Sequence, residues 1–418
     1  MPVKQLTEDA KAILLLCGRF GKREEKSDAQ PLSNGAYNAL ARWLVEKKLR
    51  PAELISQVDL HNQKDIPVDR KHLAALLTRG AALAFALEQW RGQGIWVICR
   101  SDPDYPTRLK SRLKDKAPPI LFGVGDRSLL KGGGLDIVGS RDVTEEGEQF
   151  TVEVATKCGK EGVAVASGGA RGVDETAMLT TLNAGGIVIG LLADGLAKAA
   201  VSSKYRRALS DDCALLLSPY HPDARFTVGT AMSRNKLIYA MADYTVVVSC
   251  DYNKGGTWAG ATEELGRPAS SPVFVRTTGN VSNGHAELLK LGARPFPETP
   301  WDRPFQNLLT AEGTRTRGSA QLDLVEQIDS KDAPKVMESG ASYEVSPASS
   351  IYDAVLPVIL RNLAPPKTRD ELVAELEVRK AQMDDWLKRA IKEDRILKKG
   401  RPVKYYAASS SESELPLT

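Results

Sequence analysis

The stretch VAVASGGARGVDETAMLTTLNAGGIVIGLL, residues 163–192, decides the fold. It opens with the apolar run Val163–Ala166, passes through a glycine-rich turn into the amphipathic segment Val173–Asn183, and closes with the apolar run Ile187–Leu192. Short runs of Val, Ile and Leu are typical of parallel strands, because such strands are covered on both faces. The stretch therefore predicts two parallel strands joined by a helix.

The same alternation extends to both sides of this stretch. Further strand-like runs are Gly94–Cys99, Leu135–Val138, Ala214–Ser218, Tyr244–Ser249 and Pro272–Arg276. Helix-length amphipathic segments lie between them at Glu145–Lys160, Ala231–Ala242 and Thr257–Leu265. Strands and helices in regular alternation predict an α/β fold with a doubly wound, mostly parallel, Rossmann-like sheet. We assign this domain to residues 96–310.

Three further segments flank the predicted sheet domain. Residues 1–95 carry apolar residues at helical spacing, in Ala10–Cys17, Tyr37–Leu49 and Leu73–Trp90, and predict a small helical N-terminal domain. Residues 311–348 are rich in Ser, Thr, Gly and charge, which favours a flexible linker. Residues 349–407 contain three helical patterns and a basic hairpin, as in a winged-helix-like domain, and residues 408–418 form a polar tail that we expect to be disordered.

Composition restricts the classes of function. The 418 residues are 42% hydrophobic and 26% charged, typical of a globular protein, and the net charge of +4 permits a nucleic-acid partner without requiring one. Five scattered cysteines, none of them at zinc-ligand spacing with a histidine, favour reduced thiols, and we expect no metal and no cofactor. Neither a signal segment nor a run long enough to span a bilayer is visible, so we expect a cytoplasmic protein without membrane contact.

Glycine and arginine gather where the predicted strands end. These clusters are Gly139-Ser140-Arg141, Ser167-Gly168-Gly169 with Arg171, Ser233-Arg234-Asn235, and Lys254-Gly255-Gly256-Thr257. Glycine lets the backbone approach an anion and present its N–H groups, helix N-termini favour negative charge, and arginine adds planar donors. One such cluster is usually only a tight turn, but four of them at successive strand ends predict a ligand that carries phosphate.

The chemistry at these strand ends is less specific. Neither the dinucleotide fingerprint G-x-G-x-x-G nor a P-loop occurs, and Ser167 has no histidine nearby in the pattern. Asp174 could be catalytic, but a carboxylate at this position also caps a helix or orients the neighbouring arginine, which we favour. We therefore expect a binding protein rather than an enzyme. The alternative is a small-nucleotide sensor or hydrolase at the same strand ends, suggested by Gly255-Gly256-Thr257 with Glu263.

Several motifs together resemble the DprA (Smf) family. They are Asp102-x-x-Tyr105-Pro106-x-x-Leu109, Pro118–Phe122 with Gly125-Asp126, Val138-Gly-Ser-Arg-x-x-Thr144, Ser167-Gly-Gly-Ala-Arg-Gly-Val-Asp174 and Ser233-Arg-Asn-Lys-Leu-Ile238, in family order over about residues 95–300. The resemblance implies a Rossmann-like domain with a C-terminal winged helix. It also implies a homodimer that binds single-stranded DNA, assists loading of a RecA-type recombinase and has no established catalytic activity.

The resemblance also implies site residues. The arginine of the first Gly-Ser-Arg corresponds to Arg141, and a basic residue before a phenylalanine is best matched by Arg225-Phe226. The chain departs from the family at Thr176-Ala177, where Ala-His is common, and at Lys254–Trp258, which partly resembles nucleotide phosphoribohydrolases. These departures put the exact ligand in question more than the fold. DNA uptake, general recombination and a response to foreign DNA would all use the same pocket.

The C-terminal segment carries its own basic surface. Met383, Trp386, Leu387, Ala390 and Ile391 form one apolar stripe, which we expect to be core. Positive charge lies elsewhere on the module, at Lys388, Lys392, Lys398, Lys399 and Arg401. A helix and wing with this charge could contact duplex DNA, or the module could bind a protein. Asp384 and Asp385 could instead neutralise Lys388 and Arg389 at i+4, leaving only a solvated face.

Overall fold

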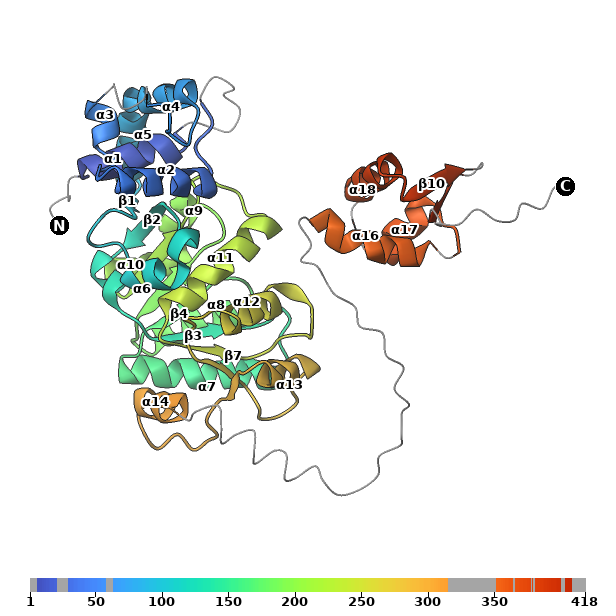
Figure 1. The fold of residues 1–418 in the computed structure, drawn as a ribbon. Helices are drawn as coiled ribbons and strands as arrows, with labels where there is room; N and C mark the ends of the chain where they lie inside the picture. The colour runs from blue at the N-terminus through green and yellow to red at the C-terminus, as the bar shows by residue number, and fades with distance from the viewer. Residues whose placement is uncertain are drawn as a thin grey trace. The chain divides into compact units, whose positions relative to one another are not determined.

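The computed structural model describes residues 6–20, 29–57, 63–314, 351–363, 365–376, 378, 380–399 and 403–407. The chain divides into two compact units, Met1–Ser330 and Lys331–Thr418. Figure 1 shows the first as helices around a large sheet and the second as a small helical module with a short hairpin. The tail predicted at 408–418 and residues 315–348 of the predicted linker lie outside the described residues. The predicted domain boundaries stay predictions.

A nine-stranded sheet forms the centre of the first unit. Its strands are β1 (Trp96–Cys99), β2 (Ile120–Gly125), β3 (Leu135–Val138), β4 (Val165–Ser167), β5 (Val188–Leu191), β6 (Ala214–Ser218), β7 (Tyr244–Val247), β8 (Val273–Val275) and β9 (Arg294–Pro295). They lie in the order β1-β2-β6-β5-β4-β3-β7-β8-β9. Along this order, every neighbouring pair from β6 through β9 is parallel. At the other edge, β1 pairs antiparallel with β2, and β2 pairs antiparallel with β6. The predicted α/β fold with a mostly parallel sheet is confirmed.

The strand order places a topological switch point beside β3. From β3 the chain adds β4, β5 and β6 on one side, and then returns to place β7 on the other side. Successive helices leave the sheet in opposite directions at such a point, so their N-termini separate and leave a crevice at the carboxyl ends of the strands. The strand order of this chain therefore puts the expected ligand position between the ends of β3 and β7.

Helices cover both faces of the sheet. They are α6 (Thr107–Leu113), α7 (Glu145–Glu161), α8 (Val173–Asn183), α9 (Leu196–Ala200), α10 (Ser203–Ser210), α11 (Val228–Met241), α12 (Gly255–Leu265), α13 (Asn283–Lys290) and α14 (Phe305–Thr314), with short 3-10 turns η2 (Lys114–Lys116) and η3 (Arg127–Lys131). Ile137 packs in one core with α7, α8 and α14, while the next residue, Val138, packs in another with α6, α11 and α12. This alternation follows from the two-residue period of a strand.

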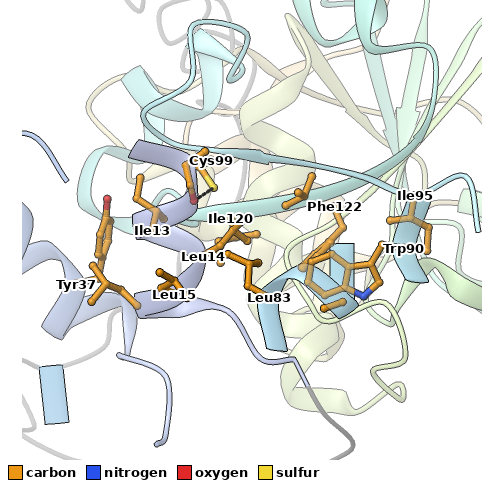
Figure 2. Packing of buried hydrophobic residues seen from close by; sticks show 14 of the residues in the cluster. Ile13, Leu14, Leu15, Tyr37, Leu83, Trp90, Ile95, Cys99, Ile120 and Phe122 are labelled. Atoms are coloured by element: carbon orange, nitrogen blue, oxygen red, sulfur yellow. Dashed lines mark hydrogen bonds between the residues drawn. The ribbon is translucent and has the colours of Figure 1, made fainter. Parts of the chain in front are cut away.

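The N-terminal helices share a core with the antiparallel edge of the sheet. They are α1 (Glu8–Cys17), α2 (Asn34–Glu46), α3 (Glu53–Ser56), α4 (Arg70–Leu77) and α5 (Gly80–Gly92). Figure 2 shows Leu14 of α1 and Trp90 of α5 packed with Ile120 and Phe122 of β2. Trp90 meets the ring of Phe122 edge-on, with the centroids 4.9 Å apart. The N-terminal helices are thus packed directly against the sheet.

The single helix predicted over Leu73–Trp90 is wrong. The chain breaks it into α4 and α5 at Arg79, whose side chain is 8% exposed. The Arg79 guanidinium donates to the carbonyl of Gly18, the residue after α1, at 3.0 Å and to that of Leu15, in the last turn of α1. Carbonyls at a helix C-terminus lack partners within the helix, so a buried arginine that satisfies them favours the break. This contact over a long sequence separation leaves no trace in the local pattern.

The second unit has the predicted winged-helix elements. They are α16 (Ile351–Asn362), α17 (Arg369–Glu375), α18 (Lys380–Lys392), β10 (Ile396–Lys399) and β11 (Lys404–Ala407), the two strands pairing antiparallel. Thr368 and Glu371 form a capping box at the start of α17. Met383, Leu387 and Ala390 are fully buried, with Trp386 and Ile391 packed beside them, which confirms the predicted apolar stripe.

Across the described residues of both units, no helix is both long enough and apolar enough to cross a membrane.

Candidate nucleic-acid interface

Three loops meet at the switch point. The backbone N–H of Ser140, after β3, donates to Ser249 Oγ, after β7, at 3.0 Å. Thr257 Oγ1, in the first turn of α12, donates to the carbonyl of Gly139 at 3.0 Å. The turn after β4 reaches the same place, because Gly172 lies against the backbone carbonyls of Ser140 and Arg141. The predicted clusters 139–141, 167–172 and 254–257 therefore form one site.

Gly172 allows the loops after β3 and β4 to pack this closely. Its φ of +89° is a conformation that residues with a side chain rarely adopt. A Cβ built on it would lie 2.5 Å from the carbonyl oxygen of Arg141 and 2.6 Å from that of Ser140. The glycine thus fixes the height of the Arg141 backbone above the sheet.

Arg141, Arg225 and Phe226 form the exposed rim of the site. The Arg141 guanidinium lies over the Phe226 ring, with Cζ 5.4 Å from the ring centroid. Phe226 is 47% exposed, although it is a large apolar side chain, and Arg225 beside it is exposed as well. Within the described residues, neither arginine forms an ion pair. Two loops thus present two cations and one aromatic face to solvent.

The turn before α12 supplies the opposite side. Lys254 is exposed, and Gly255 has a φ of +77°, so the chain turns sharply into the helix. Asn235 Nδ2 donates to the carbonyl of Gly256 at 3.0 Å and so ties this turn to α11. Asn235 therefore holds the loop, and Lys254 is the member of this cluster that is available to an anion.

Sequence reasoning missed one exposed aromatic residue near this turn. Tyr252 is 53% exposed and packs edge-on against Trp258, with the ring centroids 5.0 Å apart. An aromatic residue between a buried strand and a Gly-Gly turn is a signal that could have found it, because such loops carry ligand contacts in this fold class.

Two of the predicted phosphate contacts are buried. Ser167 has no exposed surface and its hydroxyl donates to the carbonyl of Ile137 at 2.7 Å. Arg234 is 4% exposed, and its Nη1 donates to the carbonyls of Gly168, at 2.6 Å, and Leu191. Both side chains hold the strand ends together. Arg171 is exposed but forms an ion pair with Asp142, so it is not a free cation either.

Asp174 lies beneath the loop after β4, in the first turn of α8, and is 7% exposed. Burial raises its pKa to about 6, and the Arg234 guanidinium opposes that increase, as do the backbone N–H groups of Ala170, Gly139 and Gly168. The preferred interpretation of Asp174 as an orienting carboxylate fits this environment, but its partner is Arg234 rather than the neighbouring Arg171.

The carboxylates behind the hydrolase alternative lie elsewhere on α12. Glu264 is fully buried and pairs with Arg267, while Glu263 lies 3.4 Å from Lys116 Nζ and 3.7 Å from Arg267 Nη2. Both are in the last turns of the helix, two turns beyond Gly255-Gly256. Among the described residues, no group of three or more His, Cys, Asp or Glu side chains is placed to hold a metal ion.

The basic surface of the second unit is partly described. Lys388, Lys392 and Lys398 are exposed, whereas the side chain of Lys399 and the whole of Arg401 lie outside the described residues. Asp384 pairs with Arg369 at 3.3 Å, and Arg389 pairs with Glu393 at 2.8 Å. The alternative pairing of Lys388 and Arg389 with Asp384 and Asp385 at i+4 is not formed among the described residues.

A family model described as DNA recombination-mediator protein A matches residues 96–300, the segment that forms the sheet and this site. This segment of the chain belongs to the DprA/Smf family. It is 32% identical to the DNA processing protein DprA of Bacillus subtilis over 166 residues, 39% of this chain and 54% of the relative. It is 30% identical to a DprA homologue of Mycobacterium tuberculosis over 186 residues, 42% and 46% of the two chains. The chain thus spans about half the length of these DprA relatives.

One solved DprA structure supports the fold. The DprA of Streptococcus pneumoniae superimposes with a TM-score of 0.52 at 21% identity, over 70% of this chain and 95% of that one. The DprA of Helicobacter pylori, described by its single-stranded DNA binding mode, reaches a TM-score of 0.42 over 52% of this chain. The first likeness supports the architecture of this DprA-family chain.

Proposed function

We propose that this chain binds single-stranded DNA across the rim formed by Arg141, Arg225 and Phe226. The observation that carries the proposal is the Arg141–Phe226 contact, with Cζ 5.4 Å from the ring centroid, beside an exposed Arg225. A base stacks on an aromatic face whatever its identity, while arginines neutralise the flanking phosphates. The combination favours a strand with unstacked bases, and it favours binding that tolerates many sequences.

Membership of a family of DNA recombination mediators supports the same ligand. On that basis we extend the proposal to a homodimer that protects a single strand and passes it to a RecA-type recombinase in the cytoplasm. The rim serves DNA uptake, recombination and a response to foreign DNA equally. We assign it no catalytic step, since Ser167 and Asp174 are both buried and occupied.

The site gives the small-nucleotide hydrolase no such support. The hydrolase alternative requires a carboxylate close to Gly255-Gly256. Glu263 and Glu264 instead form ion pairs with Arg267 at the far end of α12. Single-stranded DNA therefore remains the one ligand that we propose.

A titration of labelled single-stranded oligonucleotide tests the proposal. Arg141→Ala and Arg225→Ala should each weaken binding, and each should lower the slope of log K against log salt by about 0.7, the value for one lost phosphate contact on a single strand. Arg207→Ala is the control for general surface charge, because Arg207 is 95% exposed on α10; unlike the rim arginines it forms an ion pair, with Asp211 at 3.5 Å.

The control should retain both the affinity and the salt slope of the wild type. Undetectable binding by the wild type at low salt would refute the proposal. Equal losses in Arg141→Ala and Arg207→Ala would also refute it, because general charge rather than the rim would then account for binding.

A further inference from the structure

The inner part of the site has the parts of an anion cradle. The first turn of α8 borders it, and the backbone N–H groups of Gly139, Gly168 and Ala170 lie near one point, where they favour the charged form of a carboxylate. Such convergent N–H groups at a helix N-terminus bind phosphate in many α/β proteins. In this chain the point is taken, because the carboxylate of Asp174 lies there.

The fit between this carboxylate and the loop is close. A Cβ built on Gly168 would lie 2.6 Å from Asp174 Oδ2 and would overlap Arg234 Nη1. The loop backbone is therefore in contact with both charged groups, and no room is left at this position for a second anion. The chain itself fills the cradle.

Arg234 provides a second, independent indication that an anion belongs here. It is 4% exposed, and its Nε has no hydrogen-bond partner among the described residues, although the atom is buried. Nη1 of the same guanidinium donates to the carbonyl of Gly168. A buried cation that has an unused N–H group and also contacts the loop after β4 is suited to an anion, and Asp174 is its nearby counter-charge.

We propose that Asp174 is a specificity-determining residue: its carboxylate occupies the inner cradle, excludes free phosphate and mononucleotides, and leaves the outer rim to a polymeric strand. This inference rests on the proposed function. A mononucleotide offers the rim only one base and one phosphate and would gain most from the inner cradle, whereas a strand gains its affinity from several contacts along Arg141, Arg225 and Phe226. The carboxylate thus selects a polymer over its monomer.

The electrostatics of the buried groups fit this role. The titratable groups that face Asp174 are Arg234 and Tyr239 from α11, Asp136 from β3 and Tyr205 from α10. Of these only Arg234 is cationic. Burial raises the pKa of Asp174 to about 6, so the carboxylate is mostly ionised at neutral pH and repels a second anion.

Binding of inorganic sulfate tests the inference, because sulfate stays doubly charged near neutral pH and carries no base for the rim to hold. We compare the full-length wild type with Asp174→Ser, which vacates the cradle, and Asp174→Asn, which removes the charge but fills the same volume. Asp211→Ser is the matched control, since Asp211 lies on the exposed surface after α10. Affinity is measured by calorimetry at constant ionic strength, and nucleoside 5′-monophosphate forms a second arm.

Asp174→Ser should gain at least about tenfold in sulfate affinity over the wild type and over Asp211→Ser, and it should gain affinity for the monophosphate. Asp174→Asn should gain less, because the amide still occupies the cradle. If Asp174→Ser unfolds in chloride, sulfate at equal ionic strength should restore its folding, and the control should show only the general stabilisation that sulfate gives any protein.

Two results would overturn the inference: no gain in sulfate affinity or folding for Asp174→Ser, or an equal gain for Asp211→Ser. Oligonucleotide binding is measured on the same wild-type sample. If the wild type binds oligonucleotide but Asp174→Ser gains no affinity for sulfate, only the inference about Asp174 is contradicted. A wild type that fails to bind oligonucleotide contradicts the proposed function, while sulfate binding still reports on the cradle.

Discussion

The guanidinium of Arg141 lies over the ring of Phe226, with Cζ 5.4 Å from the ring centroid. Arg141 follows β3, and Phe226 precedes α11, so the contact joins two loops that are far apart in the sequence. The arginine covers one part of the aromatic ring, and the ring remains 47% exposed. This pair links a phosphate-binding cation to a base-stacking surface, and the predictions begin from it.

Phe226→Ala should weaken binding of single-stranded DNA by about 1–3 kcal/mol, the usual cost of losing one stacked base. The slope of affinity against salt should not change, because no phosphate contact is removed. Fluorescence titration at several salt concentrations measures both quantities. Phe85→Ala is the control, since Phe85 is 78% exposed on α5. A slope that falls as far as in Arg141→Ala would show that Phe226 acts only by placing the arginine.

Gly172→Ala should destabilise the protein more than Gly162→Ala does. Both glycines have a positive φ, +89° and +69°. Gly162 is in the left-handed helical region, where a side chain costs roughly 1–2 kcal/mol. Gly172 has a ψ of −135°, in a region that residues with a side chain rarely enter, at a cost of roughly 1–3 kcal/mol. Only at Gly172 would the new Cβ meet backbone, 2.5 Å from the carbonyl oxygen of Arg141, and overpacking adds about 1–3 kcal/mol. Urea denaturation measures the difference. DNA affinity should fall in Gly172→Ala alone, and equal affinities in the two variants would argue that the loop height does not matter.

Asp174→Asn should change how stability depends on pH. Burial raises the pKa of Asp174 from 3.8 to about 6 in the folded protein. Between these values the folded state binds the proton more tightly than the unfolded state, so this group makes stability fall as pH rises from about 4 to 6. Asp174→Asn has no carboxyl at this position and so lacks this loss. Between acid pH and pH 7, the free energy of unfolding of the wild type should therefore fall by up to about 3 kcal/mol more than that of the variant.

Urea denaturation between about pH 4 and pH 7 checks this prediction for Asp174→Asn. Asp211→Asn is the control, because it makes the same substitution at an exposed position after α10. Identical profiles for Asp174→Asn and the wild type would mean that Asp174 is not the titrating group.

Lys388→Gln combined with Lys392→Gln tests the second unit. Both lysines are exposed on α18 and neither forms an ion pair within the described residues. If the module contacts a duplex, the double variant should lose duplex affinity and about 1.8 of the salt slope, with single-strand binding unchanged. Lys131→Gln with Lys160→Gln, two exposed lysines of the first unit, is the control. Unchanged duplex affinity in the α18 variant would favour a protein-binding role for the module.

Local pattern was enough to predict many elements of this chain. The segment Val173–Asn183 is the helix α8 with the predicted bounds, and the apolar runs became β3, β4 and β5 within two residues. Periodicity predicts these elements because a helix or strand with one buried face, or a strand with two, has a characteristic spacing of apolar residues. It failed at Arg79, where carbonyls of α1 decide the break between α4 and α5.

The candidate site was predicted by residue type more than by role. Gly139–Arg141, Gly168–Gly172 and Lys254–Thr257 do meet at one switch point. Arg234 and Ser167 are buried there, although both were expected to face phosphate. Motif spacing cannot distinguish an arginine that binds a ligand from one that satisfies carbonyls, because it shows the residue type and its neighbours but not whether the side chain is buried. Arg141 follows β3, whereas Arg234 lies within α11, where it was expected in a loop.

The sequence by itself determined the alternation of strands and helices, the glycine-rich strand ends and the membership of a DNA-processing family, because these are properties of local spacing and residue type. Only the tertiary structure decided which groups face outward. Strand order brings β3 beside β7, buries Asp174 against Arg234 and leaves Arg141 over Phe226. Burial and charge pairing depend on residues brought together from distant segments, so no local pattern contains them.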